Sequence, residues 1–172
     1  MRSEASVDLS KLANLAEIFG TAAIVISLIY VAIQIRQNTR VMKLAAAQNV
    51  SQDLHVGLSF IIGDTEFARI HLDAMTDIDS LTPPERHRFY VFIMRYLRTF
   101  ENAYHQNEAG LLDDYVWEGF REQIKLASQT SGYSAFWRDR QQYFGREFQE
   151  FYNALSWTDP AIAVDPYKES TE

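Results

Sequence analysis

A long apolar run near the beginning of the chain dominates the pattern of hydrophobic and polar positions. The residues from Ile18 to Ile35 read IFGTAAIVISLIYVAIQI and carry no charge. As a helix, eighteen residues are about 27 Å long, close to the roughly 30 Å hydrocarbon core of a bilayer. Extending the run back to Leu12 adds a single charge, Glu17, which can reach water at the membrane edge. The pattern predicts a transmembrane helix over residues 12–36, after a tail of residues 1–11.

Two other interpretations of this run fit less well. A secretory signal peptide carries its charge at the front and a small-residue cleavage site behind. Here the run ends in Gln34-Ile35-Arg36-Gln37-Asn38, which offers no such site. A buried helix of a soluble protein rarely stays uncharged for this length, so the membrane interpretation is favoured.

Basic residues on either side of the run predict its orientation. Arg2 and Lys11 precede it, whereas Arg36, Arg40 and Lys43 follow it closely. Because the side richer in Lys and Arg faces the cytoplasm, we expect a single-pass protein of the inner (plasma) membrane, with its N-terminus outside and residues 37–158 in the cytoplasm. The same three basic residues are candidates for contact with anionic lipid headgroups.

One face of the predicted span carries small residues. At spacings of three and four, they are Ala13, Ala16, Gly20, Ala23 and Ser27. Small side chains let two helix backbones approach closely in lipid. This face predicts contact with another transmembrane helix, from a second copy or from another protein, although chance alignment of common small residues is an alternative.

The helix is expected to continue beyond the membrane to about Gly63. Only Gly57 interrupts helix-forming residues after Gln37, and a heptad-like seam recurs along the segment. Its members are Leu44, Ala47, Ser51, Leu54, Leu58 and Ile61. Packing of this seam on later helices of the same chain is favoured over a coiled coil, because the repeat is short.

Further helices are predicted through the rest of the chain. Asp64 caps a helix over residues 65–75, and Thr82 or Pro83-Pro84 opens a long helix to about Asn107. The long helix has an apolar face of Phe89, Ile93, Tyr96, Phe100 and Tyr104. A helix capped at Asp113 or Asp114 ends at a break at Ser131-Gly132, and its expected apolar contacts are Tyr115, Trp117, Phe120, Ile124 and Ala127.

Two more helices follow this break. Ser134 caps a short aromatic helix, a last helix covers residues 146–156, and Asp159-Pro160 opens a tail of residues 159–172. No alternating strand pattern occurs. The predicted fold is all-α: a transmembrane helix that continues into a soluble bundle of about five further helices.

Composition narrows the function without naming one. A net charge of −7 argues against nucleic-acid binding, which needs a basic surface. The absence of cysteine excludes a thiolate nucleophile and a cysteine-based metal centre. No phosphate-binding glycine loop is present. Glu101 and His105 are four residues apart, a spacing that can bind a metal, but two isolated ligands fit an ordinary surface better. We therefore predict no cofactor, no metal and no catalytic residue.

Two charged groups remain as candidates for contact. Asp113, Asp114, Glu118 and Glu122 gather at a helix start, where acids complement the helix dipole. A polar stripe on the long helix is a possible anion or partner face, and it consists of Arg88, Arg95, Arg98, Asn102 and His105. A solvated face with local ion pairs is the simpler interpretation of the stripe.

Several segments resemble an uncharacterised family of bacterial single-span membrane proteins. The anchor segment SLIYVAIQIRQNTR, the run Gly110-Leu111-Leu112-Asp113 with Trp117, Trp137 with Arg140, and Phe144 with Glu147-Phe148 are similar to its motifs. Two positions depart from them: Ser131-Gly132 replaces Pro-Gly, and Gly145 replaces a serine that would cap the last helix. The resemblance covers most of residues 15–156; it implies the same architecture and adds no activity.

Three classes of function follow from these features. The favoured one is a membrane-anchored protein–protein interaction module, acting as a homo-oligomer or as an accessory subunit of a larger membrane complex. The alternative is a membrane-tethered sensor or enzyme that binds a small ligand or anion through the arginine stripe. A pore of ringed spans is weaker, because Thr21, Ser27 and Gln34 supply little polar lining.

Overall fold

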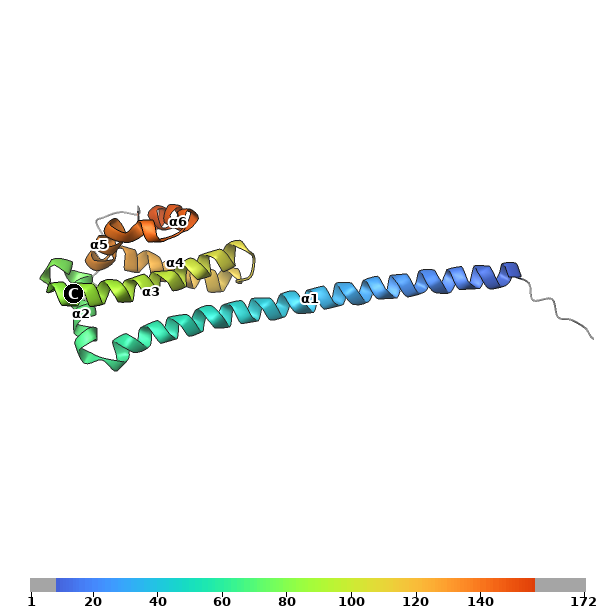
Figure 1. Ribbon diagram of the computed structural model, residues 1–172, viewed down its shortest axis with the longest axis horizontal. Helices are drawn as coiled ribbons and strands as arrows, with labels where there is room; N and C mark the ends of the chain where they lie inside the picture. Colours follow the sequence, from blue (N-terminus) through green and yellow to red (C-terminus); the bar gives the residue numbers. More distant parts are fainter. Residues whose placement is uncertain (1–8, 157–172) are drawn as a thin grey trace, which may run out of the picture. The chain divides into compact units, whose positions relative to one another are not determined.

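The computed structural model describes residues 9–156, and every element of regular secondary structure within them is a helix (Figure 1). The α-helices are α1 (Leu9–Gly63), α2 (Thr65–Thr76), α3 (Pro83–Glu108), α4 (Asp114–Ser128), α5 (Ser131–Arg140) and α6 (Arg146–Ser156). Two 3₁₀ turns, η1 (Ile78–Ser80) and η2 (Gln141–Tyr143), join them. The predicted all-α fold is confirmed, with five helices after the long first one. The tail beyond residue 158 and most of the N-terminal tail lie outside the described residues.

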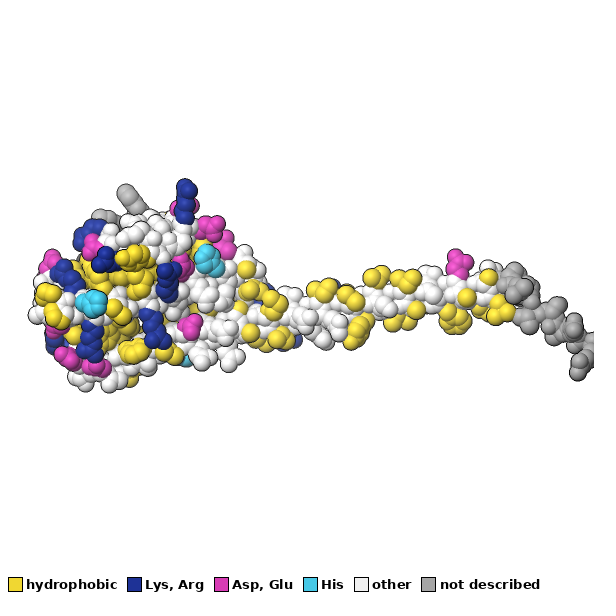
Figure 2. All heavy atoms as spheres, in the orientation of Figure 1, with side chains coloured by type: hydrophobic (Ala, Val, Ile, Leu, Met, Phe, Trp, Pro, Cys, Tyr) yellow, Lys and Arg dark blue, Asp and Glu magenta, His cyan; other side chains and the backbone are white. Residues whose placement is uncertain are grey.

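Contacts divide the chain into two compact units, Met1–Met42 and Lys43–Glu172. We call the first the apolar unit and the second the helical domain. In the apolar unit, every described side chain from Leu12 to Met42 is exposed, and Figure 2 shows hydrophobic side chains along this segment. It contains a stretch long and apolar enough to cross a membrane, none of it buried. As predicted, α1 does not end there and continues to Gly63.

The start of α2 and both ends of α3 follow local chemistry visible in the sequence. Asp64 accepts a hydrogen bond from the Phe67 N–H at 2.9 Å and so caps α2. Thr82 and Glu85 form a capping box at the start of α3, where prolines occupy the first turn. After α3, Gly110 turns the chain with a φ of +69°, a conformation that L side chains rarely adopt.

The core of the helical domain is built around α3. Its side chains Phe89, Ile93, Leu97 and Phe100 are almost completely buried. Helix α3 packs against α4, α2 packs against α5, and α4 packs against α6 (Figure 1). Helix α2 also contacts α3, where Phe67 meets Phe92 edge to face with 5.1 Å between ring centroids. The predicted aromatic face of α3 is therefore the centre of the domain.

The second half of α1 belongs to the helical domain, and most of the predicted seam packs there, although the buried face is shifted at its beginning. Leu44, a predicted seam residue, is 65% exposed, whereas Ala46, Val50 and Gly57 are buried. Leu54, Leu58 and Ile61 pack against the core as predicted. The buried stripe follows the 3.6-residue period of a straight helix on a core, and a strict heptad drifts away from that period. Gly57 lies under Tyr96, where a Cβ would be 3.9 Å from the tyrosine ring.

Three predictions around α4 and α5 were wrong. Ser131-Gly132 does not separate the helices, because α5 begins at Ser131 and Thr130 is its N-cap. Ser134 therefore caps nothing, and its hydroxyl donates to the Ser128 carbonyl at 2.8 Å. Tyr115 is 79% exposed and supplies no core contact. Periodicity locates helices, but the close approach of α5 to the core is a tertiary contact that it does not report.

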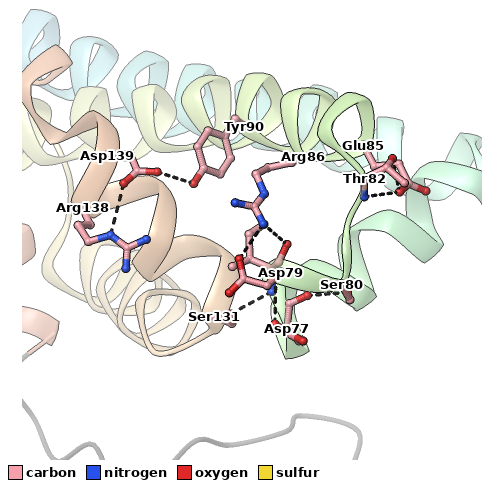
Figure 3. Close-up of polar contacts among 11 residues, drawn as sticks. Asp77, Asp79, Ser80, Thr82, Glu85, Arg86, Tyr90, Ser131, Arg138 and Asp139 are labelled. Carbon is pink, nitrogen blue, oxygen red and sulfur yellow. Dashed lines mark hydrogen bonds and ion pairs between the residues drawn. The ribbon is translucent and has the colours of Figure 1, made fainter.

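Polar contacts fasten η1 and α5 to α3 (Figure 3). Arg86 donates to the Asp79 carboxylate at 2.8 Å and to the Ile78 carbonyl at 3.0 Å. The Ile78 N–H donates to the Ser131 hydroxyl, and the Tyr90 hydroxyl donates to Asp139 at 2.9 Å. These charged groups are occupied with one another, so the network acts as a structural clamp.

Candidate functional site

The small-residue face of the apolar unit is exposed along its whole length. It comprises Ala13, Ala16, Gly20, Ala23 and Ser27. The Ser27 hydroxyl donates to the Ala23 carbonyl at 2.8 Å, and Thr21 does the same to Glu17 at 2.9 Å. These hydroxyls are satisfied within the helix, as a hydrocarbon environment requires. A Cβ on Gly20 would meet nothing within 4 Å, so the helix surface there is open to a neighbour.

The three basic residues after the predicted span are not equivalent. Arg36 and Arg40 are exposed on α1. Lys43 instead reaches Asp113, with 3.3 Å between its Nζ and Oδ1 of the acid. This contact joins α1 to the start of α4 inside the helical domain and offsets the lysine charge. Arg36 and Arg40 are therefore the stronger candidates for headgroup contact.

The predicted arginine stripe on α3 is exposed but largely paired. Arg88 forms ion pairs with Asp64 and Glu66, and its guanidinium lies 5.2 Å from the centroid of the Phe67 ring. The cap bond from Phe67 and the neighbouring Arg88 guanidinium lower the pKa of the Asp64 carboxyl. Asn102 accepts from the Gln106 side chain.

Among the three arginines of the stripe, Arg95 is the one without an ion pair to a described residue. Its guanidinium lies 5.2 Å from the centroid of the Phe60 ring. Both groups line a cavity of about 220 Å³. Phe67, Val91, Phe92 and the ion pair of Arg88 with Asp64 complete its lining. The arrangement offers one uncompensated cation beside apolar walls.

Arg98 and Glu101 organise the start of α6. The Glu101 side chain accepts from Arg98 at 2.5 Å and from the Gly145 N–H at 2.6 Å. Arg98 also donates to the Tyr143 carbonyl and lies 4.8 Å from the centroid of the Phe144 ring. A carboxylate on α3 thus holds the backbone just before α6 by the N–H of Gly145 itself, whereas a serine at this position would accept from N–H groups within the first turn. This Glu101–Arg98 latch is structural. Local ion pairing of the stripe was predicted, but the contacts with Tyr143 and Gly145 were missed.

Metal-binding groups do not gather in the part of the chain that the structure describes. Glu101, four residues before the exposed His105, is committed to Arg98 and Gly145. In the acidic group at the start of α4, Asp113 is the N-cap residue, Glu118 pairs with Arg121 and Glu122 pairs with Lys125. The two glutamates are therefore neutralised by basic side chains of the same helix.

A second cavity, of about 250 Å³, was not foreseen from the sequence. Residues from five helices line it: Leu58, Ile61, His71, Met75, Phe92, Tyr96, Gln123, Leu126, Ala127 and Tyr133, together with Thr130. Burial lowers the pKa of His71 to about 4 and raises the pKa values of Tyr96 and Tyr133. All three side chains are therefore neutral at pH 7. No sequence signal joins them, because they come from three different helices.

No protein-family model, curated protein or solved structure matches this chain. The class of protein therefore rests on the architecture itself: an all-α chain in which a long apolar N-terminal helix, a candidate membrane span, precedes a helical domain. The resemblance to bacterial single-span proteins stays a prediction.

Proposed function

We propose that this protein is a single-pass membrane protein whose anchor associates with another helix and holds the domain at the cytoplasmic face as an interaction module. One observation carries the proposal. The apolar unit is a continuous helix with no buried side chain between Leu12 and Met42. So much apolar surface on one helix is unfavourable in water and is satisfied by lipid or by a second helix.

The partner proposed for the anchor is a second copy of this chain. The face around Gly20 and Ser27 has small side chains, while Ile18, Val25 and Ile29 lie on the opposite side of the helix by the 100° turn per residue. Two copies meeting on the small face would bring their backbones into close van der Waals contact, leaving the bulky face for lipid.

Cysteine cross-linking in native membranes tests this association, because the chain has no cysteine of its own. Gly20→Cys and Ser27→Cys are expected to form disulfide-linked dimers under mild oxidation. Ile18→Cys and Val25→Cys are the matched controls on the opposite face and should remain monomeric. Equal cross-linking on both faces would refute a specific helix pair.

Native mass spectrometry after gentle detergent extraction identifies the wild-type partner. A homodimer supports the second-copy proposal. A defined complex with another membrane protein would replace it with an accessory-subunit role, and a monomer that also fails to cross-link would overturn the interaction module.

The proposed topology places the N-terminus outside and the domain inside. Its support is the cluster of Arg36, Arg40 and Lys43 after the span, although Lys43 is partly neutralised by Asp113. Single cysteines at Ser3 and Gln142 can be labelled in intact cells with a membrane-impermeant maleimide. Labelling of Ser3→Cys alone is the expected result, and labelling of Gln142→Cys alone would reverse the orientation.

A second candidate function is anion binding at the arginine stripe. The observation that favours it is the cavity in which the unpaired Arg95 lies beside Phe60 and Val91. Such a site suits an amphipathic carboxylate, with its charge at the guanidinium and its apolar part against the aromatic walls. Titration of the wild type and of Arg95→Gln with hexanoate tests it: binding that is lost in the variant supports this function, and equal binding refutes it.

A further inference from the structure

The cavity of about 250 Å³ between α1, α2, α3, α4 and α5 is a pocket of the helical domain alone. Most of its lining is apolar, with side chains such as Ile61, Met75 and Phe92. It reaches the surface beside Leu126, which is 56% exposed. A small molecule therefore has both a route in and a largely apolar site to occupy.

Three polar side chains without a hydrogen bond to any described residue line this space. Tyr133 is 3% exposed and Tyr96 is 6% exposed, and neither hydroxyl makes a hydrogen bond to any described residue. The partly buried His71 imidazole also lacks one. Two other aromatic side chains of the domain do have partners: Tyr90 donates to Asp139, as Figure 3 shows, and Trp137 donates to Asn153 at 2.8 Å. These polar atoms are not among the fully buried atoms that lack a partner, so water in the cavity can reach them. A ligand that offers a hydrogen-bond acceptor can take the place of that water.

The lining defines the chemistry of that ligand. No Lys, Arg, Asp or Glu lines the cavity, so a buried ligand charge would have no counterion there. The rings of His71, Tyr96 and Tyr133 meet at steep angles, with 6.5 Å between the centroids of His71 and Tyr133 and 6.0 Å between those of Tyr96 and Tyr133. Aromatic walls favour a planar ring, and phenolic hydroxyls favour a hydrogen-bond acceptor.

We propose that this cavity binds a small, uncharged aromatic carbonyl compound. The aromatic ring occupies the apolar part between Phe92, Met75 and Ile61, and the carbonyl oxygen accepts hydrogen bonds from Tyr133 and Tyr96. The volume lies below the roughly 300–1,000 Å³ of sites for drug-sized ligands, so the ligand is of one or two rings. This site is separate from the anchor face and from the arginine stripe.

Three probes of similar size separate the parts of this proposal. Acetophenone carries both the ring and the carbonyl, ethylbenzene lacks the carbonyl, and benzoate adds a charge. Because one net hydrogen bond contributes a modest free energy, acetophenone is expected to bind about threefold to tenfold more tightly than ethylbenzene. Benzoate is expected not to bind in the cavity.

Methionine methyl groups report the binding in the full chain reconstituted in lipid nanodiscs. The methionines are labelled with ¹³C at their methyl groups. Met75 lines the cavity, whereas Met94 on α3 and Met42 on α1 do not. Acetophenone should shift the Met75 signal saturably and leave Met94 unchanged. A probe that only dissolves in the lipid does not produce a saturable shift at Met75, and that result would overturn the proposal.

Matched variants test the assigned hydroxyls. Tyr133→Phe and Tyr96→Phe keep the ring and should bring the acetophenone-to-ethylbenzene affinity ratio towards one. Tyr90→Phe removes a hydroxyl outside the cavity and should leave the ratio unchanged. Ala127→Leu fills the cavity and should abolish the Met75 shift with both neutral probes. Equal wild-type affinities for ethylbenzene and acetophenone, or tighter binding of benzoate, would refute the proposed ligand class.

Discussion

Substituting alanine for Gly132 places a methyl group against two parts of the core that cannot easily move aside. A Cβ at this position would lie 2.6 Å from Cε1 and 2.7 Å from Cζ of Phe89, and 2.8 Å from the Ala74 carbonyl oxygen. Phe89 is fully buried, and the carbonyl belongs to the backbone of α2. Helix α5 can therefore accept alanine only if it moves away from α2 and α3.

The expected effect combines two opposing contributions. Overpacking of a core typically costs about 1–3 kcal/mol, and contacts on two sides favour the upper end. Alanine in a helix recovers about 0.5–1 kcal/mol relative to glycine. The net expectation for Gly132→Ala is a loss of about 2 kcal/mol in the free energy of unfolding. For a domain of this size, that lowers Tm by roughly 6–10 °C.

Thermal unfolding of the full chain in detergent, followed by tryptophan fluorescence and circular dichroism, measures this loss. Gly119→Ala is the matched control, since it lies on α4 and a Cβ there would meet nothing within 4 Å. The control should gain about 0.5–1 kcal/mol from helix propensity alone. If Gly132→Ala raised Tm as Gly119→Ala does, the close approach of α5 to Phe89 would be wrong.

The Glu101–Arg98 latch predicts that Glu101→Gln lowers the free energy of unfolding by about 1–2 kcal/mol, because the hydrogen bonds from Arg98 and Gly145 lose their charged acceptor; hydrogen exchange should speed up first at the Gly145 amide, and uniform loss of protection would contradict the latch. Because burial lowers the pKa of His71 from 6.5 to about 4, the native state binds fewer protons than the unfolded state between these values. The contribution of His71 to the free energy of unfolding is therefore complete above pH 6.5, and the free energy of unfolding falls by up to about 3 kcal/mol as the pH drops to 4. In urea titrations across this range, His71→Gln should lose less than the wild type, and parallel curves would refute the assignment. Finally, Gly110→Ala should cost about 1 kcal/mol in urea unfolding, because of the φ of +69°, and Gly110→Asn should cost less; a neutral Gly110→Ala would show that the turn adjusts freely.

Much of the fold could be read from local pattern. The long apolar helix, its continuation to Gly63, the Asp64 cap and the Thr82 start of α3 all depend on residues within one or two turns of each other. Helix periodicity and capping are properties of neighbouring residues, so a single sequence carries them in full. The same holds for the aromatic face of α3.

The candidate sites depended on contacts between distant segments. Sequence spacing placed Arg88, Arg95 and Arg98 on one polar face and favoured local ion pairs such as Arg98 with Glu101. It could not show that Asp64 pairs with Arg88 or that the Tyr143 carbonyl accepts from Arg98. Both partners come from other segments: Asp64 precedes α2 and Tyr143 belongs to η2. The stripe therefore contributes less free charge than its composition indicates.

The sequence by itself determined which segments are helical, where most helices begin, and that the first is apolar enough to cross a membrane. Only the tertiary structure decided that Gly132 lies inside α5 against Phe89, and that His71, Tyr96 and Tyr133 line one cavity. The reason is physical: periodicity records which residues share a face of one helix, whereas a cavity is formed by the packing of several helices. That packing depends on side-chain volumes far apart in the chain.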